Sequence, residues 1–380
     1  MTLALPATGT FVGRAWRPDR NGPALIVRRG AEAVDITCSE VPTMQALLDR
    51  DDAASFARTA PGESLGPLDA LAEASVETPG GAHLLAPCDL QPVKACGVTF
   101  VSSMLERVIE EQAKGDPARA LAIRDRCTAI LGDSLRAVEP GSDNAQKLKE
   151  VLIADGVWSQ YLEVGIGPYA EVFSKAQPMA AVGFGASVGL HPISTWNNPE
   201  PEIVLACDGQ GRIKGATLGN DVNLRDVEGR SALLLGKAKD NNASCAVGPM
   251  LRLFDDSYGL DDVRNAELTL TVTGTDGYVL NGRSSMSQIS RDPEDLVAQT
   301  CGAHHQYPDG FFLMLGTLFA PTEDRDVPGE GFTHKLGDVV EISEPALGRL
   351  ANTVRLSTEC PPWRFGTSAL MRNLAARGLL

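Results

Sequence analysis

Two acidic residues stand where an extended chain would bring their side chains together. Glu200 and Glu202 flank Pro201, directly before the apolar run 203–207. Residues two apart in an extended chain point to the same face, so we expect the two carboxylates side by side. Pro201 has no N–H to give to a sheet, which favours a strand entry or an edge strand here.

A turn of sequence DGQG follows this run and predicts a hairpin. If Cys207 faces Arg212, the returning chain brings Gly219–Asp221 opposite Asn198–Glu200. Asp221 then lies near the two glutamates. Three carboxylates gathered at one point repel one another unless a cation lies between them. Ligands that are all oxygen favour Mg²⁺, Mn²⁺ or Ca²⁺ over Zn²⁺; a solvated acidic strand end is the alternative.

The composition limits the classes of protein and of partner. The chain has 380 residues, 43 % of them hydrophobic, and a formal net charge of -15. This length is natural for two domains with sizeable cores. An acidic surface repels nucleic acid and anionic lipid, so we expect neither as a partner. The start, MTLALPATGTFVG, predicts no signal peptide, and no apolar run approaches the roughly 20 residues of a membrane span. We therefore expect a cytoplasmic protein, with its eight scattered cysteines reduced.

The elements that must position the acidic residues change in type along the chain. Residues 1–90 predict a small β-rich N-terminal domain with a polar helical patch at 43–58, and residues 91–380 predict a second domain. Helical patterns follow Val98, at about 103–114, 117–131 and 143–154. Ser103 and Glu106 match the spacing of a capping box. After residue 160, short apolar runs (AAVGF, EIVLAC, ELTLTVTG, FFLMLGTLF, DVVEIS) alternate with turn residues. We predict an α+β, mostly β fold rather than a parallel βαβ fold.

The polar residues after the hairpin carry a resemblance to a known family. Asn220-Asp221 is followed by Arg225-Asp226, then by Lys239 and by Gly248-Pro249. Together with Glu200-Pro201-Glu202, this order and spacing resembles the fumarylacetoacetate hydrolase superfamily over about residues 95–345. The resemblance implies a catalytic domain of rolled, mixed β-sheets, preceded by a small N-terminal domain.

The resemblance also implies the roles of individual residues. Metal ligands would be Glu200, Glu202 and Asp221, holding Mg²⁺, with Mn²⁺ as the alternative. The metal would bind the carboxylate and 2-keto oxygens of a pyruvate-like group. Further residues are expected at the substrate: Lys239, Lys175 in EVFSK, and Thr317 in the Gly-Thr pair of MLGTLFAPT. Ser285 is a candidate for binding a substrate hydroxyl, with a plain turn as its alternative.

One departure from the family pattern concerns the reaction. Hydrolases of the family typically show Tyr-x-x-His-x-x-Glu, whose His and Glu activate water. The matching stretch here begins at Phe100, keeps Glu106, and has Ser103 in place of His. A serine hydroxyl is not a general base near neutral pH. C–C bond hydrolysis by this dyad is therefore not expected. Ser103 stays a candidate catalytic residue beside Glu106, and Phe100 a candidate substrate-binding residue.

Several phrases resemble instead the branch of the family that dehydrates 2-keto-3-deoxy sugar acids, among them WNNPEPE, GKAKDNNASCA and HHQYPDGF. We predict a lyase that converts a 2-keto-3-deoxypentonate to 2-oxoglutarate semialdehyde in non-phosphorylating pentose catabolism. A base, Glu106 or Lys239, removes a C3 proton; Lys239 requires a depressed pKa for this role. The C4 hydroxyl leaves as water. A hydrolase or decarboxylase of acylpyruvates is the alternative, as is a sugar-acid binding protein without activity. We expect a homodimer or homotetramer, as in the family.

Overall fold

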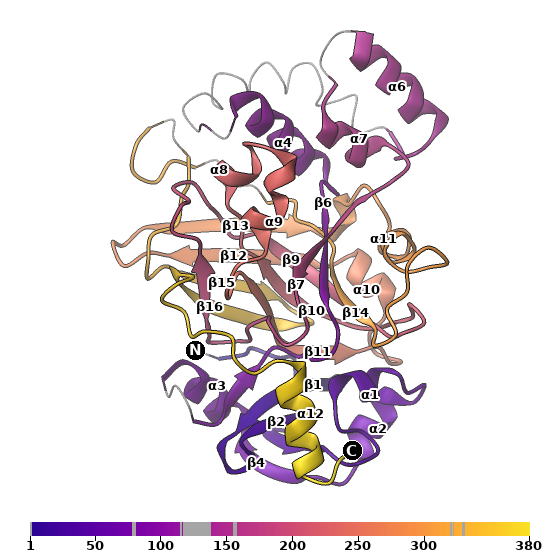
Figure 1. The fold of residues 1–380 in the computed structure, drawn as a ribbon, viewed down its shortest axis with the longest axis vertical. Helices are drawn as coiled ribbons and strands as arrows, with labels where there is room; N and C mark the ends of the chain where they lie inside the picture. The colour runs from indigo at the N-terminus through magenta and orange to yellow at the C-terminus, as the bar shows by residue number, and fades with distance from the viewer. Residues whose placement is uncertain are drawn as a thin grey trace.

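The computed structural model describes residues 2–77, 81–114, 116, 138–154, 158–319, 321, 323–328 and 331–380. In this part of the chain most strands belong to two sheets, between which the largest hydrophobic core lies. The helical segments α4, α6, α7, α8 and α9 gather at one end of the molecule in Figure 1, and the N-terminal strands lie at the other. The predicted helix at 117–131 falls outside the described residues.

The larger sheet has 11 described strands in the order β4-β3-β2-β1-β11-β10-β9-β14-β6-β7, with β5 paired to β1. Its strands are β1 (Phe11–Arg17), β2 (Gly22–Arg29), β3 (Glu32–Asp35), β4 (Glu63–Pro67), β5 (His83–Leu85), β6 (Val93–Gly97), β7 (Glu171–Ala176), β9 (Pro201–Cys207), β10 (Ile213–Asp221), β11 (Cys245–Leu253) and β14 (Phe311–Met314).

The smaller sheet has five described strands in the order β13-β12-β15-β16-β8. They are β8 (Ser187–Leu190), β12 (Glu267–Thr273), β13 (Val279–Ser285), β15 (Val339–Glu344) and β16 (Gly348–Leu356). In β12, Leu268, Leu270 and Val272 are buried and alternate with more exposed polar residues. This alternation places one face of the sheet on the core.

The helices are short and lie at the ends and edges of the sheets. They are α1 (Met44–Leu48), α2 (Ala53–Thr59), α3 (Leu68–Glu77), α4 (Val101–Ala113), α6 (Asp143–Ala154), α7 (Gln160–Ile166), α8 (Arg225–Glu228), α9 (Leu235–Lys239), α10 (Leu260–Arg264), α11 (Pro293–Thr300) and α12 (Thr367–Ala376). Single 3₁₀ turns occur at η1 (Pro18–Arg20), η2 (Ala232–Leu234) and η3 (Met286–Gln288).

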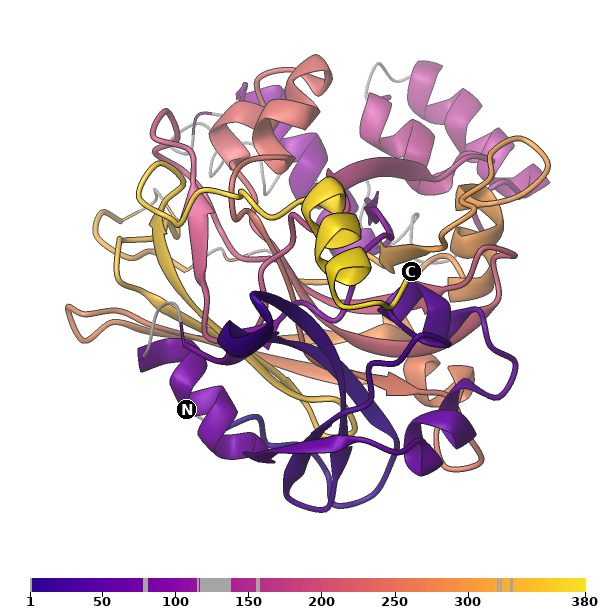
Figure 2. The ribbon, with the colours of Figure 1, turned by 60° about the horizontal axis from the view of Figure 1, so that its bottom comes forward.

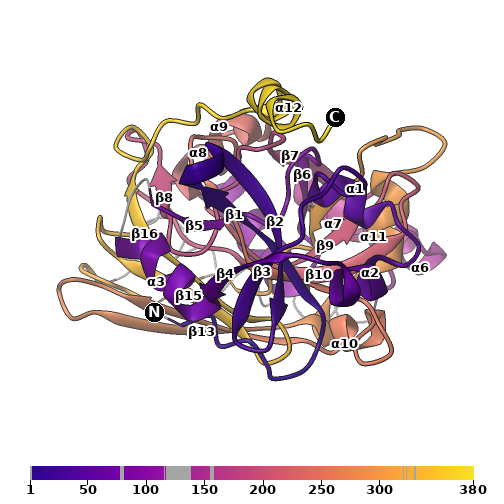
Figure 3. The same cartoon turned by 90° about the horizontal axis from the view of Figure 1, so that it is seen from below.

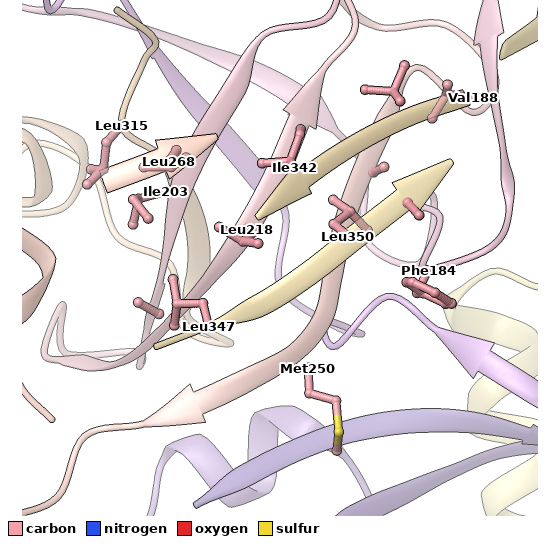
Figure 4. Packing of buried hydrophobic residues seen from close by; sticks show 14 of the residues in the cluster. Phe184, Val188, Ile203, Leu218, Met250, Leu268, Leu315, Ile342, Leu347 and Leu350 are labelled. Carbon is pink, nitrogen blue, oxygen red and sulfur yellow. The ribbon is translucent and has the colours of Figure 1, made fainter. Parts of the chain in front are cut away.

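Strand β9 lies in the interior of the larger sheet and contributes residues to two hydrophobic clusters. Ile203 and Leu205 pack into the core between the sheets. Figure 4 shows Ile203 of this core together with Leu218 and Leu268. Val204 and Ala206 point to the opposite face, into a second cluster with residues of β14 and the N-terminal strands. Every residue of β9 is buried. The strand that carries Glu202 is therefore fixed by packing on both faces.

The N-terminal strands join the rest of the molecule through a strand pair. Phe11 and Val12 of β1 lie opposite Arg252 and Leu251 of β11, so one sheet runs across the predicted domain boundary. The C-terminal helix α12 returns to the same region, where Figures 2 and 3 show it beside the N-terminal strands. Its Asn373 donates hydrogen bonds to the carbonyls of Arg20 and Asn21. The division of the chain at residue 90 stays a prediction.

Candidate active site

The hairpin of β9 and β10 brings three carboxylates together at one end of the larger sheet. Gly219 lies opposite Glu202, and the N–H of Asp221 donates to the carbonyl of Glu200 at 3.0 Å. Glu200, Glu202 and Asp221 each offer an oxygen within 4.8 Å of the others, and their residues are 5 %, 2 % and 1 % exposed. The predicted convergence of these three side chains is confirmed.

The predicted register of this hairpin was wrong by a small shift. Cys207 lies opposite Ile213, not Arg212, and the pairing shifts again between Ile213 and Gly215. A bulge inserts an extra residue into one strand and bends it locally. As a result Gly219 lies opposite Glu202, whereas the predicted register placed it opposite Glu200. Asp221 still lies close to the two glutamates, because a shift of this size leaves it at the same end of the hairpin as Glu200.

Two buried lysines lie against the carboxylates. The ammonium group of Lys239, at the end of α9, contacts Glu200 Oε2 at 2.5 Å and Asp221 Oδ2 at 3.0 Å. Lys175, on β7, contacts Asp221 Oδ1 at 2.6 Å and donates to the carbonyls of Val222 and Lys239. The sequence analysis expected both lysines at the substrate. The contacts of Lys175 favour a role in positioning Asp221.

The pKa shifts follow from burial and from these neighbours. Burial raises the pKa of the Glu202 carboxyl well above its usual value, and repulsion from Asp221 and Glu200 adds to this. Burial also raises the pKa of Asp221, but Lys175 and Lys239 outweigh it and hold that pKa below its usual value. Burial lowers the pKa of Lys239, yet Asp221 and Glu200 outweigh it, so its pKa lies above normal. Lys239 is a cation in this state, and the depressed pKa required of a base is not present.

The carboxylate cluster fits a divalent cation. Glu202 accepts a hydrogen bond from the backbone N–H of Gly316 at 2.6 Å, and the described part of the chain gives it no ion pair of its own. A buried carboxylate with unmet negative charge attracts a cation, and three carboxylate oxygens suit Mg²⁺ or Mn²⁺.

Helix α4 brings Glu106 toward the site. The guanidinium of Arg225 lies 3.5 Å from Glu106 Oε2, rests over the ring of Trp196 and donates to the carbonyl of Pro321. Ser103 lies inside the helix, which begins at Val101, so the predicted capping box is wrong. Its hydroxyl donates to the carbonyl of Phe100 at 2.9 Å, a local bond typical of a serine within a helical turn.

Three further residues were predicted to bind the substrate: Thr317, Phe100 and Ser285. Gly316 adopts φ +91, and Thr317 Oγ1 accepts from the N–H of Phe319. Phe100 is fully buried in the core between the sheets. The hydroxyl of Ser285 donates to Glu267 on β12 and pairs with Ser287. Its contacts lie on the neighbouring strand β12 and in η3, and its role at the substrate stays a prediction.

Two charged residues at the site were missed by the sequence analysis. Arg107 follows Glu106 on α4 and contacts Glu200 Oε1 at 2.5 Å and Glu228 Oε2 at 2.9 Å. Glu171 begins β7, two residues before Phe173 and four before Lys175, so the three share a face. Burial, with repulsion from Glu228 next, raises the pKa of Glu171 to about 7. The period-two spacing from Lys175 is the sequence feature that could have identified Glu171.

A comparison with family profiles agrees with this site. The profile described as fumarylacetoacetate (FAA) hydrolase C-terminal matches residues 201–355. These residues belong to the fumarylacetoacetate hydrolase family. The matched residues include β9, β10 and α9, and hence Glu202, Asp221 and Lys239.

Two curated relatives share sequence with this chain. A probable 2-keto-3-deoxyxylonate dehydratase from Haloferax volcanii is 29 % identical over 194 residues, 51 % of this chain and 63 % of the relative. A 2-dehydro-3-deoxy-D-arabinonate dehydratase from Saccharolobus solfataricus is 30 % identical over 188 residues, 49 % of this chain and 58 % of the relative. The match thus spans about three fifths of the length of each relative.

A solved structure shows the same fold over most of the chain. A 2-keto-3-deoxy-D-arabinonate dehydratase complexed with magnesium and 2,5-dioxopentanoate aligns with 91 % of this chain and 99 % of its own, at a TM-score of 0.64 and 20 % identity. The predicted α+β fold of the family, with its large mixed sheets, is confirmed. Among the helices that the structure describes, none is long and apolar enough to cross a membrane.

Proposed function

We propose that this protein is a metal-dependent hydro-lyase that converts a 2-keto-3-deoxypentonate to 2-oxoglutarate semialdehyde, which is 2,5-dioxopentanoate. The observation that carries the proposal is the pairing of a buried carboxylate triad with a helix that presents Glu106 but no histidine. The names of the two curated relatives support the same reaction, as does the ligand named for the solved structure.

Residues of the hairpin would hold the metal. Glu200, Glu202 and Asp221 would bind Mg²⁺, which supplies positive charge where negative charge develops on the 2-keto oxygen. The chain prepares this site in advance: Lys175 holds Asp221, and the Gly316 N–H holds Glu202. Preorganised partners of this kind avoid reorganisation during the reaction.

Two carboxyl groups supply the proton transfers. The Glu106 carboxylate, oriented by Arg225, removes a C3 proton. Glu171, with a pKa of about 7, holds a proton that it gives to the departing C4 hydroxyl, which leaves as water. An environment that raises one carboxyl pKa is a common way to keep an acid available near neutral pH. Ser103 takes no part in proton transfer, since its hydroxyl is bonded to the Phe100 carbonyl.

After the loss of water, the product forms by proton shifts alone, and the carbon skeleton is unchanged. Loss of the C3 proton and the C4 hydroxyl leaves a C3–C4 double bond conjugated with the 2-keto group. Transfer of a proton from C5 to C3 moves the double bond to C4–C5, where it bears the C5 hydroxyl. This enol becomes the aldehyde when C4 takes up a proton and the hydroxyl loses one.

Product analysis tests the proposal. The protein with Mg²⁺ is incubated with a panel of 2-keto-3-deoxy acids and 2,4-diketo acids in deuterated water, and the products are followed by NMR. We expect an aldehyde from a five-carbon keto-deoxy acid, with deuterium at C3. Rapid release of pyruvate from acylpyruvates, with no dehydration of any keto-deoxy acid, would instead favour the hydrolase branch of the family.

We also propose that the protein acts in the cytoplasm as a homodimer or homotetramer. Family resemblance and apolar strand runs support the assembly, and the acidic charge of -15 supports a partner set of small molecules only. A monomeric mass by light scattering at micromolar concentration would contradict the assembly.

A further inference from the structure

The proposed substrate carries a carboxylate, and the lysines of the site are poorly placed to meet it. The side chain of Lys175 is 0 % exposed, and its ammonium group already has three acceptors, Asp221 and the carbonyls of Val222 and Lys239. An ammonium group has three N–H donors, so none remains. Lys239 is 3 % exposed and lies between Glu200 and Asp221.

The two arginines of the site differ in accessibility. The side chain of Arg225 is 3 % exposed, stacks on Trp196 and donates to the carbonyl of Pro321. The side chain of Arg107 is 13 % exposed and reaches Glu200 from α4. Arg107 is therefore the better placed of the two to meet an incoming anion.

A bound cation changes the balance of charge around Arg107. One arm of its guanidinium contacts Glu200 Oε1 at 2.5 Å, and the other contacts Glu228 Oε2 at 2.9 Å. When Glu200 shares its charge with a divalent ion, its attraction for Arg107 falls and the ion repels the guanidinium. Glu228 lies outside the triad and keeps Arg107 at the site.

The backbone of the Gly-Thr segment does not replace this arginine. The N–H of Gly316 donates to Glu202, and Thr317 Oγ1 accepts from Phe319. A planar guanidinium, by contrast, binds a carboxylate through two parallel N–H groups.

We propose that Arg107 binds the carboxylate of the 2-keto acid, moving one arm of its guanidinium from Glu200 to the substrate when a divalent ion occupies the triad. The inference rests on the proposed function above, which supplies the chemical class of the ligand. It makes Arg107 at once a competitor of the metal and a partner of the substrate.

The test measures binding rather than turnover. Mn²⁺ affinity is measured by calorimetry on the full chain without a keto acid. Affinities for pyruvate and for its uncharged analogue pyruvamide are then measured on the Mn²⁺-loaded protein. Arg107→Gln removes the charge, Arg107→Lys keeps it, and Arg264→Gln removes an arginine that pairs with Asp261, Asp292 and Glu294 on the surface.

Opposite shifts are expected in Arg107→Gln. Mn²⁺ binds severalfold more tightly because a competing charge is gone, and pyruvate binds about tenfold more weakly while pyruvamide is unaffected. Arg107→Lys regains part of the pyruvate affinity, and Arg264→Gln matches the wild type. An equal loss of Mn²⁺ and pyruvate affinity in Arg107→Gln would show that Arg107 has only a structural role. Unchanged pyruvate affinity in this variant would also overturn the proposal, and so would a wild type that binds no pyruvate. A wild type that binds both ligands as expected but dehydrates no keto-deoxy acid refutes the proposed function alone.

Discussion

Lys175 and Asp221 form an ion pair of 2.6 Å in which the two side chains are 0 % and 2 % exposed. They come from β7 and β10, which are not neighbours in the sheet. Replacing Lys175 by Met leaves Asp221 with Lys239 as its cation, and breaking a buried pair typically costs about 3–5 kcal/mol. We expect a loss of that size in the free energy of unfolding in EDTA, measured by urea titration, and a smaller loss with Mg²⁺.

The matched control for this variant is Lys335→Met. Lys335 pairs with Asp276 and Asp326 on the surface, where its side chain is 40 % exposed. A surface pair contributes about 1 kcal/mol or less. An equal loss of unfolding free energy in both variants would mean that the buried pair contributes no more to stability than the surface pair.

Glu202→Gln should separate metal binding from folding. The change removes one of three mutually repelling buried carboxylates, and burial has already raised the pKa of this carboxyl. We expect a melting temperature in EDTA no lower than that of the wild type, and no rise on addition of Mg²⁺. Glu344→Gln, a buried carboxyl outside the triad, should keep the rise. A full Mg²⁺ response of Glu202→Gln would contradict the assignment of the ligand.

Glu171 should give the metal-free protein a distinct pH dependence. Its folded-state pKa of about 7 exceeds the ordinary 4.5, so the folded protein keeps a proton that the unfolded chain loses. The free energy of unfolding therefore falls as pH rises from about 4.5 to about 7, and this loss is complete above that range. Urea titrations in EDTA across this range should show the slope in the wild type and a smaller slope in Glu171→Gln. Identical slopes would refute the shift.

Gly316→Ala should damage both the fold and the site. Gly316 has φ +91, and a Cβ there would lie 2.0 Å from Thr99 Oγ1. Its N–H also holds Glu202. Left-handed backbone alone costs a non-glycine residue about 1–2 kcal/mol. Gly277→Ala, with φ +84 and open space around it, measures that strain alone. We expect a larger loss of stability for Gly316→Ala, together with weaker Mg²⁺ binding.

Glu106 and Ser103 should differ strongly in their effect on turnover. Glu106→Gln removes the proposed base, a change that typically costs about 10²–10⁴-fold in rate. Ser103→Ala removes a hydroxyl bonded to the Phe100 carbonyl, worth about 0.5–1.5 kcal/mol. Steady-state assays on the keto-deoxy acid measure both. Glu111→Gln, on the same helix but paired with Ser159 and Gln160, serves as the control. A large effect of Ser103→Ala with little effect of Glu106→Gln would reverse these roles.

The sequence alone determined the parts of the site that depend on local geometry. Glu200 and Glu202 share a face because residues two apart always do in an extended strand, and a short turn returned Asp221 to them. The order of motifs was enough to predict the family fold and the two lysines. The alternation of Leu268, Leu270 and Val272 likewise fixed the face that β12 turns to the core.

Only the tertiary structure decided which groups from distant elements meet at the triad. Arg107 looks like an ordinary surface charge in the sequence, because nothing local shows that the middle of α4 lies beside Glu200 and Glu228. The spacing of Glu171 from Lys175 indicates a shared face, but not that Glu228 lies close enough to raise its pKa. The start of α4 at Val101 turned the expected cap at Ser103 into an internal bond, and a bulge after Ile213 shifted the hairpin. Pairings between distant segments depend on how whole elements pack. Sequence spacing therefore could not predict the full set of charges around the carboxylates. For the same reason it could not predict the pKa values that depend on those charges.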